Sequence, residues 1–372
     1  MKKFILGLAF LCCSVGLTAC QVRDKEQTER ESFSKTDQSG IYEIAFMEEA
    51  EEEESIFYRN VWEGTAEYVK KNQITYHYYR PRENTEKAYG KAIEAAVKRG
   101  AKIIISKGEF FEKNIYRLQD EYPRVQFLLL DGEPKNEGGE KKGASNVHCI
   151  LFKEEEAGYL AGYAAVCEGY TRLSVWGIEK DSKIDRYGYG FEQGAGAAAE
   201  KMDTRVELKY CYYNKSALDK DETKYEISEK MEHCFLSGIQ IIFACDNRLM
   251  NLAAKAAEKR EGKVMGVAID LAQESEILLA STVKNYTDAI IMALEDLYNN
   301  GGMWPNERAG KTVTLGAKEE MLKLSGGEKI WRFDNFSKLD YWKIYRILKN
   351  EEINISITSV PGTDRVKIEG GE

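Results

Sequence analysis

The chain has 372 residues, of which 43% are apolar and 31% charged, with 31 glycines and only 5 prolines. This length suits two or more domains with ordinary cores, and the composition excludes extensive disorder and collagen-like or proline-rich structure. The net charge of −9 argues against nucleic acid as a partner, because phosphate binding needs a basic face. The histidines His77, His148 and His233 are too scattered to indicate a zinc site.

The first twenty residues have the pattern of an export and anchoring signal. Lys2 and Lys3 precede an apolar run at 4–15, which is too short to span a bilayer. The run leads to Leu-Thr-Ala-Cys at 17–20, which resembles the bacterial lipobox. We therefore expect 1–19 to be removed as a lipoprotein signal peptide and Cys20 to carry the lipid. The alternative is a conventional cleavage site with Cys20 as an ordinary residue.

The segment after Cys20 has the composition of a flexible tether. Residues 21–40 consist mainly of Lys, Glu, Arg, Asp, Gln, Ser and Thr, which cannot bury enough apolar surface to offset the entropy of folding. The pattern over 1–40 predicts a protein held by lipid at the extracytoplasmic face of the cell membrane.

Five cysteines remain beyond the lipobox. They are odd in number and lie mostly within apolar runs, so we expect small buried hydrophobic residues with at most an incidental disulfide. These are Cys149, Cys167, Cys211, Cys234 and Cys245.

From residue 41 onward, apolar runs alternate with segments of helical spacing. Such alternation predicts parallel α/β sheets. In the first series we expect strands at 41–47, 74–79, 102–106, 125–130 and 147–152, and helices at 57–71, 85–99, 110–121 and 154–168. The second series predicts strands at 173–178, 206–213, 239–245, 263–269, 277–283 and 312–315, and helices at 186–201, 223–237, 286–299 and 341–349. A further helix follows strand 239–245 and ends at residue 260.

Two such series predict two lobes. We expect an N-terminal lobe at 41–151 with part of the C-terminal region returning to it, and a C-terminal lobe at 152–320. A crossover helix and tail would follow at 321–372, with helix 341–349 as the segment that returns.

Ligands of open α/β sheets bind beyond the carboxyl ends of the strands. In a two-lobed protein these ends face each other across a cleft, so the loops after the strands hold the candidate contacts. By position these include Glu48, Glu109, Asp246, Asn247 and Lys284.

Six stretches resemble the basic membrane protein family, the substrate-binding lipoproteins of ABC importers related to a purine nucleoside receptor. The clearest is Glu-Glu-Ala-Gly-Tyr-Leu-Ala-Gly-Tyr-Ala-Ala at 155–165. The others are Phe-Tyr-Arg-Asn-Val-Trp-Glu-Gly at 57–64, Gly-Phe-Glu-Gln-Gly at 190–194, Gly-Val-Ala-Ile-Asp at 266–270, Ser-Thr-Val-Lys at 281–284 and Leu-Gly at 315–316. The resemblance implies a two-lobed α/β fold like that of the type I periplasmic binding proteins, with a hinge between lobes.

The resemblance also implies how a nucleoside would bind. Phe57 and Tyr187 would stack on the base, Asp270 would accept hydrogen bonds from ribose hydroxyls, and Lys284 would end a strand facing the cleft. For each residue a structural role, in core packing, a turn or a solvated strand end, stays open.

Several positions depart from the family pattern. Tyr58 replaces an asparagine, Ala268 replaces an aspartate, and Glu48 replaces the aspartate of the first strand. Losing such polar partners changes discrimination between ligands. The acidic run at 48–54 suggests a cation site, but a solvated lip is the simpler interpretation.

The small residues of the signature helix have a structural interpretation. Gly158, Ala161, Gly162 and Ala164 recur at helical spacing and form one smooth face, so we expect close helix packing without a ligand role.

No catalytic motif is present, so we expect a binding protein rather than an enzyme, without a cofactor or metal. The leading function is a lipid-anchored receptor of an ABC importer. It would capture a small solute, most simply a nucleoside, in the cleft between its lobes and present it to the permease subunits. The alternatives are a ligand sensor or regulatory partner of the same fold with a non-nucleoside ligand, and a nucleoside hydrolase.

Overall fold

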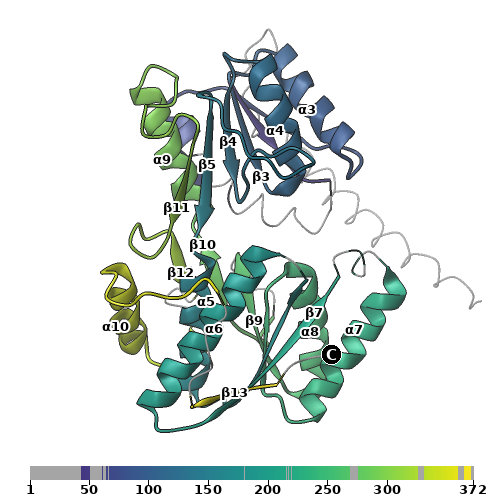
Figure 1. The fold of residues 1–372 in the computed structure, drawn as a ribbon, viewed down its shortest axis with the longest axis vertical. Coiled ribbons are helices and arrows are strands. Elements are labelled where there is room, and N and C mark those ends of the chain that lie inside the picture. The colour runs from purple at the N-terminus through teal and green to yellow at the C-terminus, as the bar shows by residue number, and fades with distance from the viewer. Residues whose placement is uncertain are drawn as a thin grey trace, which may run out of the picture. The chain divides into compact units, whose positions relative to one another are not determined.

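The computed structural model describes residues 43–50, 61, 64–65, 67–179, 181–214, 216, 218, 220–268, 275–325, 331–358 and 364–369. The chain divides into two compact α/β units (Figure 1). Unit 1 holds the described residues up to Cys149 together with Ile290–Thr312, and unit 2 holds Ile150–Ala289 together with the residues from Val313 onward. The chain therefore passes from one unit to the other three times.

Unit 1 is built on a six-stranded sheet in the order β11-β5-β4-β3-β1-β2. The pairs β1–β2, β1–β3 and β3–β4 are parallel. The bounds of the strands are β1 Ile44–Met47, β2 Tyr76–Tyr79, β3 Ile103–Lys107, β4 Gln126–Leu130, β5 Val147–Phe152 and β11 Lys311–Leu315. Strands β1 and β4 are buried along their whole length, as strands covered on both faces must be.

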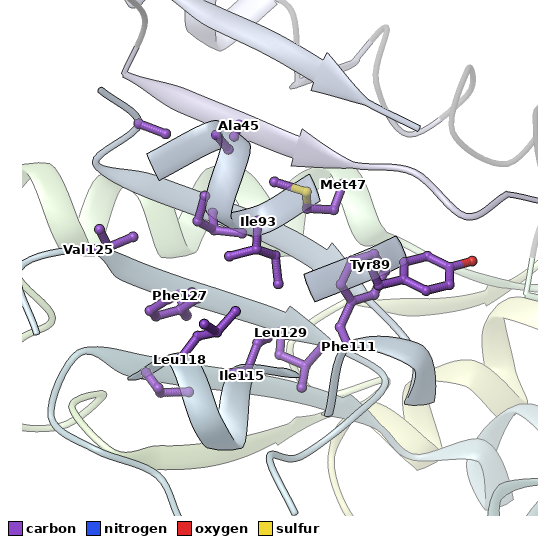
Figure 2. Close-up of a cluster of buried hydrophobic side chains, with 14 of the residues drawn as sticks. Ala45, Met47, Tyr89, Ile93, Phe111, Ile115, Leu118, Val125, Phe127 and Leu129 are labelled. Carbon is purple, nitrogen blue, oxygen red and sulfur yellow. The ribbon is translucent and has the colours of Figure 1, made fainter. Parts of the chain in front are cut away.

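Helices α3 (Glu86–Lys98) and α4 (Glu109–Glu121) pack on this sheet. Thr85 caps α3, where its side chain accepts a hydrogen bond from the Ala88 amide. Figure 2 shows Ile93 of α3 and Ile115 of α4 pointing into a shared core with Phe127 of β4. All three side chains are fully buried, so burial of apolar surface holds the two helices on the sheet.

The segment that returns to unit 1 is 290–312, which contains most of α9 (Tyr286–Asn299). The Trp304 indole N–H donates to the Asn146 carbonyl at 3.2 Å. We expected helix 341–349 to return instead. In the structure α10 (Lys338–Lys349) lies in unit 2, where the Tyr345 hydroxyl donates to the Leu322 carbonyl at 2.8 Å.

Unit 2 is built on a seven-stranded sheet in the order β12-β10-β9-β8-β6-β7-β13. Strand β12 pairs with β10 in the antiparallel direction. The other pairs whose direction the described residues define are parallel. The strands are β6 Arg172–Ile178, β7 Val206–Tyr213, β8 Ile241–Ala244, β9 Lys263–Ala268, β10 Leu278–Lys284, β12 Leu322–Leu324 and β13 Val366–Glu369. The helices are α5 Glu154–Glu168, α6 Ser182–Lys201, α7 Asp221–Leu236 and α8 Asn247–Arg260, with α10.

Helices α6 and α7 cover opposite faces of the unit 2 sheet. A Cβ atom added at Gly188 of α6 would lie 3.1 Å from a ring carbon of Tyr210 and 3.3 Å from the Tyr212 hydroxyl, whereas the Lys230 ammonium of α7 lies 5.4 Å from the centre of the Tyr213 ring. Because side chains alternate along β7, residues 210 and 212 face one side and residue 213 the other. The two mostly parallel sheets flanked by helices confirm the predicted fold class.

Two strands were not predicted. Strand β12 has 3 residues, and β13 exposes three of its 4 side chains, so neither has the apolar run that identifies a buried strand. Helix α6 also begins four residues earlier than predicted, because Asp181 caps it and accepts a hydrogen bond from the Lys183 amide at 2.9 Å.

Helices α5 and α6 touch through their backbones. A Cβ atom added at Gly162 would lie 2.0 Å from the Phe191 carbonyl oxygen, and one added at Gly194 would lie 2.0 Å from the Tyr159 carbonyl oxygen. No residue with a side chain fits at such a distance. The close packing predicted for the glycine face of the signature helix is therefore observed.

Among the described residues, no helix combines the length and the apolar character that crossing a bilayer requires.

Candidate ligand-binding site

In unit 1, the predicted residues Glu48 and Glu109 follow the neighbouring strands β1 and β3. The Glu48 carboxylate accepts a hydrogen bond from the Arg80 Nε at 2.8 Å, so its charge is already balanced. Glu109 is exposed and opens α4 directly after Gly108, whose φ of +85° favours glycine. Both residues lie at the carboxyl edge of the unit 1 sheet, the edge at which ligands of parallel sheets bind.

In unit 2, the predicted residues Asp246 and Asn247 follow β8. Asp246 caps α8 by accepting a hydrogen bond from the Arg248 amide at 2.9 Å, and it also pairs with the Arg248 Nε at 3.2 Å. The side-chain oxygen of Asn247 is buried and has no hydrogen-bond partner among the described residues. A buried acceptor left unpaired is costly.

Lys284, the last residue of β10, is 6% exposed. Its ammonium lies 2.7 Å from the carboxylate of Glu154, the first residue of α5. Glu154 is fully buried and also pairs with Arg186 of α6, while Glu155 lies 3.9 Å from the same guanidinium. We call Glu154, Glu155, Arg186 and Lys284 the ion cluster; it contains two anions and two cations, so formally its charges cancel.

The predicted stacking residue Tyr187 lies beside the ion cluster. Its ring is buried, meets Phe243 edge-on at 6.1 Å and lies 5.8 Å from the Lys284 ammonium, which is also 5.2 Å from the Phe152 ring. Such contacts fix the orientation of a ring. The structure thus brings Tyr187 and Lys284 together at one edge of unit 2.

Other predicted residues lie outside the described part of the chain. These are Phe57, Tyr58, Asp270 and the lipidation residue Cys20. Conversely, the ion cluster partners Glu154 and Arg186 were not predicted as site residues. The three consecutive acids at 154–156 were a visible signal, but sequence spacing does not pair a residue with another one 130 positions away.

Glu192 of α6 is another buried carboxyl group of unit 2, and it lies against Tyr210 of β7. The Tyr210 hydroxyl lies 3.0 Å from the Gly188 carbonyl and 3.0 Å from the Glu192 Oε2, but it has a single proton to donate. The other oxygen of Glu192 has no partner in the described part of the chain. Burial raises the pKa of Glu192, and the Tyr210 hydrogen bond opposes that rise only in part.

The raised pKa of Glu192 has a stability consequence. A carboxyl group whose folded pKa exceeds its unfolded pKa contributes stability below the unfolded value and loses it as the pH rises. Glu192→Gln, which keeps the shape without the charge, should therefore match the wild type near pH 4 and exceed it by about 1–3 kcal/mol near pH 8, the cost of a buried unsatisfied group. Urea denaturation across this pH range measures the difference. Glu200→Gln, exposed on the same helix, is the matched control, and an equal gain at every pH would contradict the assignment.

Unit 2 also has a surface pocket of about 410 Å³ at the C-terminal ends of α5 and α6. It is lined by Cys167, Glu168, Gly169, Lys201, Met202, Asn335, Phe336 and Asp340. Glu154 and the ion cluster lie at the other end of α5, so this pocket is separate from the candidate site. In the described part of the chain, no three His, Cys, Asp or Glu side chains gather as a metal site.

The comparison with protein families decides the classification. The model of the Bmp family, described as ABC transporter substrate-binding protein PnrA-like, matches residues 41–361. This chain belongs to the Bmp family. The match covers every strand of the two sheets except β13, and all the predicted ligand residues. The predicted lipidation residue Cys20 lies before its first residue.

Solved structures with the same fold are only distantly related to this Bmp protein. A solute-binding protein of an ABC transporter system from Conexibacter woesei is 15% identical, with a TM-score of 0.64 over 86% of this chain and 99% of that one. One from Aeropyrum pernix is 17% identical, with a TM-score of 0.59 over 84% and 87%. A transcriptional activator of the comK gene from Bacillus halodurans is 16% identical, with a TM-score of 0.62 over 83% and 96%. These similarities show the fold, and no curated protein sequence matches the chain.

Proposed function

We propose that the ligand of this chain is an uncharged nucleoside bound at the carboxyl edge of the unit 2 sheet. By its family the chain is an ABC-transporter solute-binding protein of the PnrA-like type, and its partners are accordingly a small molecule and permease subunits. The observation that carries the proposal is the arrangement at the unit 2 edge, where a fixed aromatic ring, Tyr187, accompanies a buried acceptor, the Asn247 oxygen, that lacks a partner among the described residues. A ring suits a flat heterocycle, and the acceptor suits a hydroxyl or ring N–H donor.

The charges at this edge favour a nucleoside over its phosphate. Lys284 and Arg186 are both paired with Glu154, and Arg248 is paired with Asp246. A phosphate would have to compete with these carboxylates for each cation. We therefore expect the protein to bind nucleosides and to discriminate against nucleoside monophosphates.

A thermal-shift screen of the chain from Gln21 onward tests the ligand. Nucleosides, free bases, ribose, amino acids and nucleoside monophosphates are compared at equal concentration. A nucleoside present at one hundred times its Kd should stabilise the protein by about 2.7 kcal/mol, and the monophosphate should give no shift. Stabilisation by an amino acid or a sugar, with none by a nucleoside, would overturn the ligand and leave the family assignment intact.

Substitutions at the site separate ligand contact from folding. Asp270→Ala and Asn247→Ala should each remove most of the nucleoside shift while leaving the melting temperature of the free protein nearly unchanged. Asn72→Ala, exposed in unit 1, is the matched control and should keep the full shift. If Asn247→Ala binds as the wild type does, its unpaired oxygen is not a ligand contact.

We further propose that the protein is anchored through Cys20 at the extracytoplasmic face of the membrane. The support is the order of basic residues, apolar run and lipobox in 1–20, which lie outside the described residues. Metabolic labelling with palmitate, lost in Cys20→Ala, tests the anchor.

A further inference from the structure

His148 joins strand β5 to the segment that returns to unit 1. Its side chain is fully buried. Val147 and Cys149, on either side of it, share the core of α3 and α4, so the alternation along a strand turns His148 to the opposite face of the sheet. There its Nδ1 lies 3.0 Å from the Lys311 carbonyl oxygen, and its ring centre lies 5.2 Å from that of Trp304.

The hydrogen bond to Lys311 fixes which ring nitrogen of His148 carries the proton. A carbonyl oxygen can only accept, so Nδ1 is the donor and the neutral ring has no proton on Nε2. This Nε2 is buried and has no hydrogen-bond partner in the described part of the chain. A proton added to Nε2 would therefore create a buried cation whose new N–H lacks an acceptor, which is costly.

The charges that face the ring do not compensate such a cation. The returning segment presents the Arg308 guanidinium and the Asp296 carboxylate, which pair with each other at 2.8 Å. Strand β11 presents the Lys311 carbonyl while the Lys311 side chain is exposed, and the uncharged Gln126 faces the segment from β4. Burial accordingly lowers the pKa of His148 to about 4, although the hydrogen bond to Lys311 opposes this change.

The neighbours of His148 hold the same stretch of the returning segment. The Asn146 carbonyl accepts from the Trp304 indole at 3.2 Å, and the Val147 carbonyl accepts from the Gly310 amide at 2.8 Å. We propose that protonation of His148 at Nε2 releases residues 304–311 from β5, so that this contact is a pH switch within unit 1. The step takes up one proton from solvent and breaks no covalent bond. Release lets water reach the ring, so the open form binds the proton more readily than the closed form.

Hydrogen exchange of the full-length chain, followed by mass spectrometry at pH 7.5 and pH 5, measures the release. Exchange rates are corrected for the intrinsic effect of pH. Because the pKa of His148 is about 4 in the closed form and about 6.5 in a free histidine, the opening equilibrium of 304–311 should rise about 30-fold at pH 5. Peptides from α3, in the same unit, should change much less. Unchanged protection of 304–311, or an equal loss throughout unit 1, would overturn the proposal.

Matched variants identify the group that titrates. The side-chain amide of His148→Asn can donate to the Lys311 carbonyl in place of Nδ1 but takes up no proton, so 304–311 should be equally protected at both pH values. His77→Asn removes the other histidine of unit 1 and should keep the effect of acid. An acid effect that persists in His148→Asn would contradict the assignment. Circular dichroism checks that each variant is folded, and if His148→Asn is not, the comparison of 304–311 with α3 in the wild type decides the proposal.

Discussion

Glu154→Gln should destabilise the protein by about 3–5 kcal/mol, the usual cost of removing one partner from a buried ion pair. Glu154 is fully buried and balances the charges of both Lys284 and Arg186. Glutamine keeps the size of the side chain but removes the negative charge that pairs with the buried Lys284 ammonium and with the Arg186 guanidinium. Urea denaturation at pH 7 measures the loss of stability.

A double-mutant cycle separates this effect from a change in packing. Lys284→Met removes the buried ammonium and leaves Glu154 paired with Arg186, so it should cost less than Glu154→Gln. Combined, the two changes should be less destabilising than the sum of the single variants. Glu207→Gln, which breaks the exposed pair with Arg172, is the matched control and should cost less than about 1 kcal/mol. Simple additivity in the cycle would show that Glu154 and Lys284 do not depend on each other.

The order of most elements could be predicted, because each of these elements has a strong local signal. The helices at 154–168 and 286–299 and the strand at 206–213 have the predicted bounds, since apolar runs and helical spacing are properties of neighbouring residues. Strand β13 could not be predicted, because it is defined by pairing with β7, from which 152 residues separate it. Segment 290–312 lies in unit 1 for a similar reason: the contact of Trp304 with Asn146 joins distant positions.

The candidate site could be predicted only by position. The rule that ligands bind at the carboxyl ends of parallel strands places Glu48, Glu109, Asp246, Asn247 and Lys284 correctly at sheet edges. The rule does not indicate which side chains pair with these residues. Lys284 was predicted as a possible ligand contact, yet the structure pairs it with Glu154; a direct contact with ligand stays a prediction and would require that pair to rearrange.

The glycine contacts connect the helix packing to the site. A Cβ atom added at Gly158 would lie 2.1 Å from the Tyr187 carbonyl oxygen, and one added at Gly190 would lie 2.0 Å from the Glu155 carbonyl oxygen. These contacts bring the first turn of α5 against the first turns of α6. Glu154 consequently reaches Arg186, and Tyr187 lies beside Lys284. The close helix packing at these glycines therefore positions the charged side chains of the ion cluster and the ring of Tyr187.

The same packing makes Gly162→Ala strongly destabilising. The added methyl group would lie 2.0 Å from the Phe191 carbonyl oxygen, so the two helices must separate. We expect a loss of about 3 kcal/mol, at the upper end of the usual cost of overpacking, although alanine is otherwise the better helix former. Thermal and urea denaturation measure it. Gly188→Ala on α6 is the matched control: its methyl group would lie 3.1 Å from a ring carbon of Tyr210, a side chain that can move, so its cost should be less than half as large. Equal stability of Gly162→Ala and the wild type would mean that α5 and α6 are not in backbone contact, and the positioning of Glu154 and Tyr187 would need another cause.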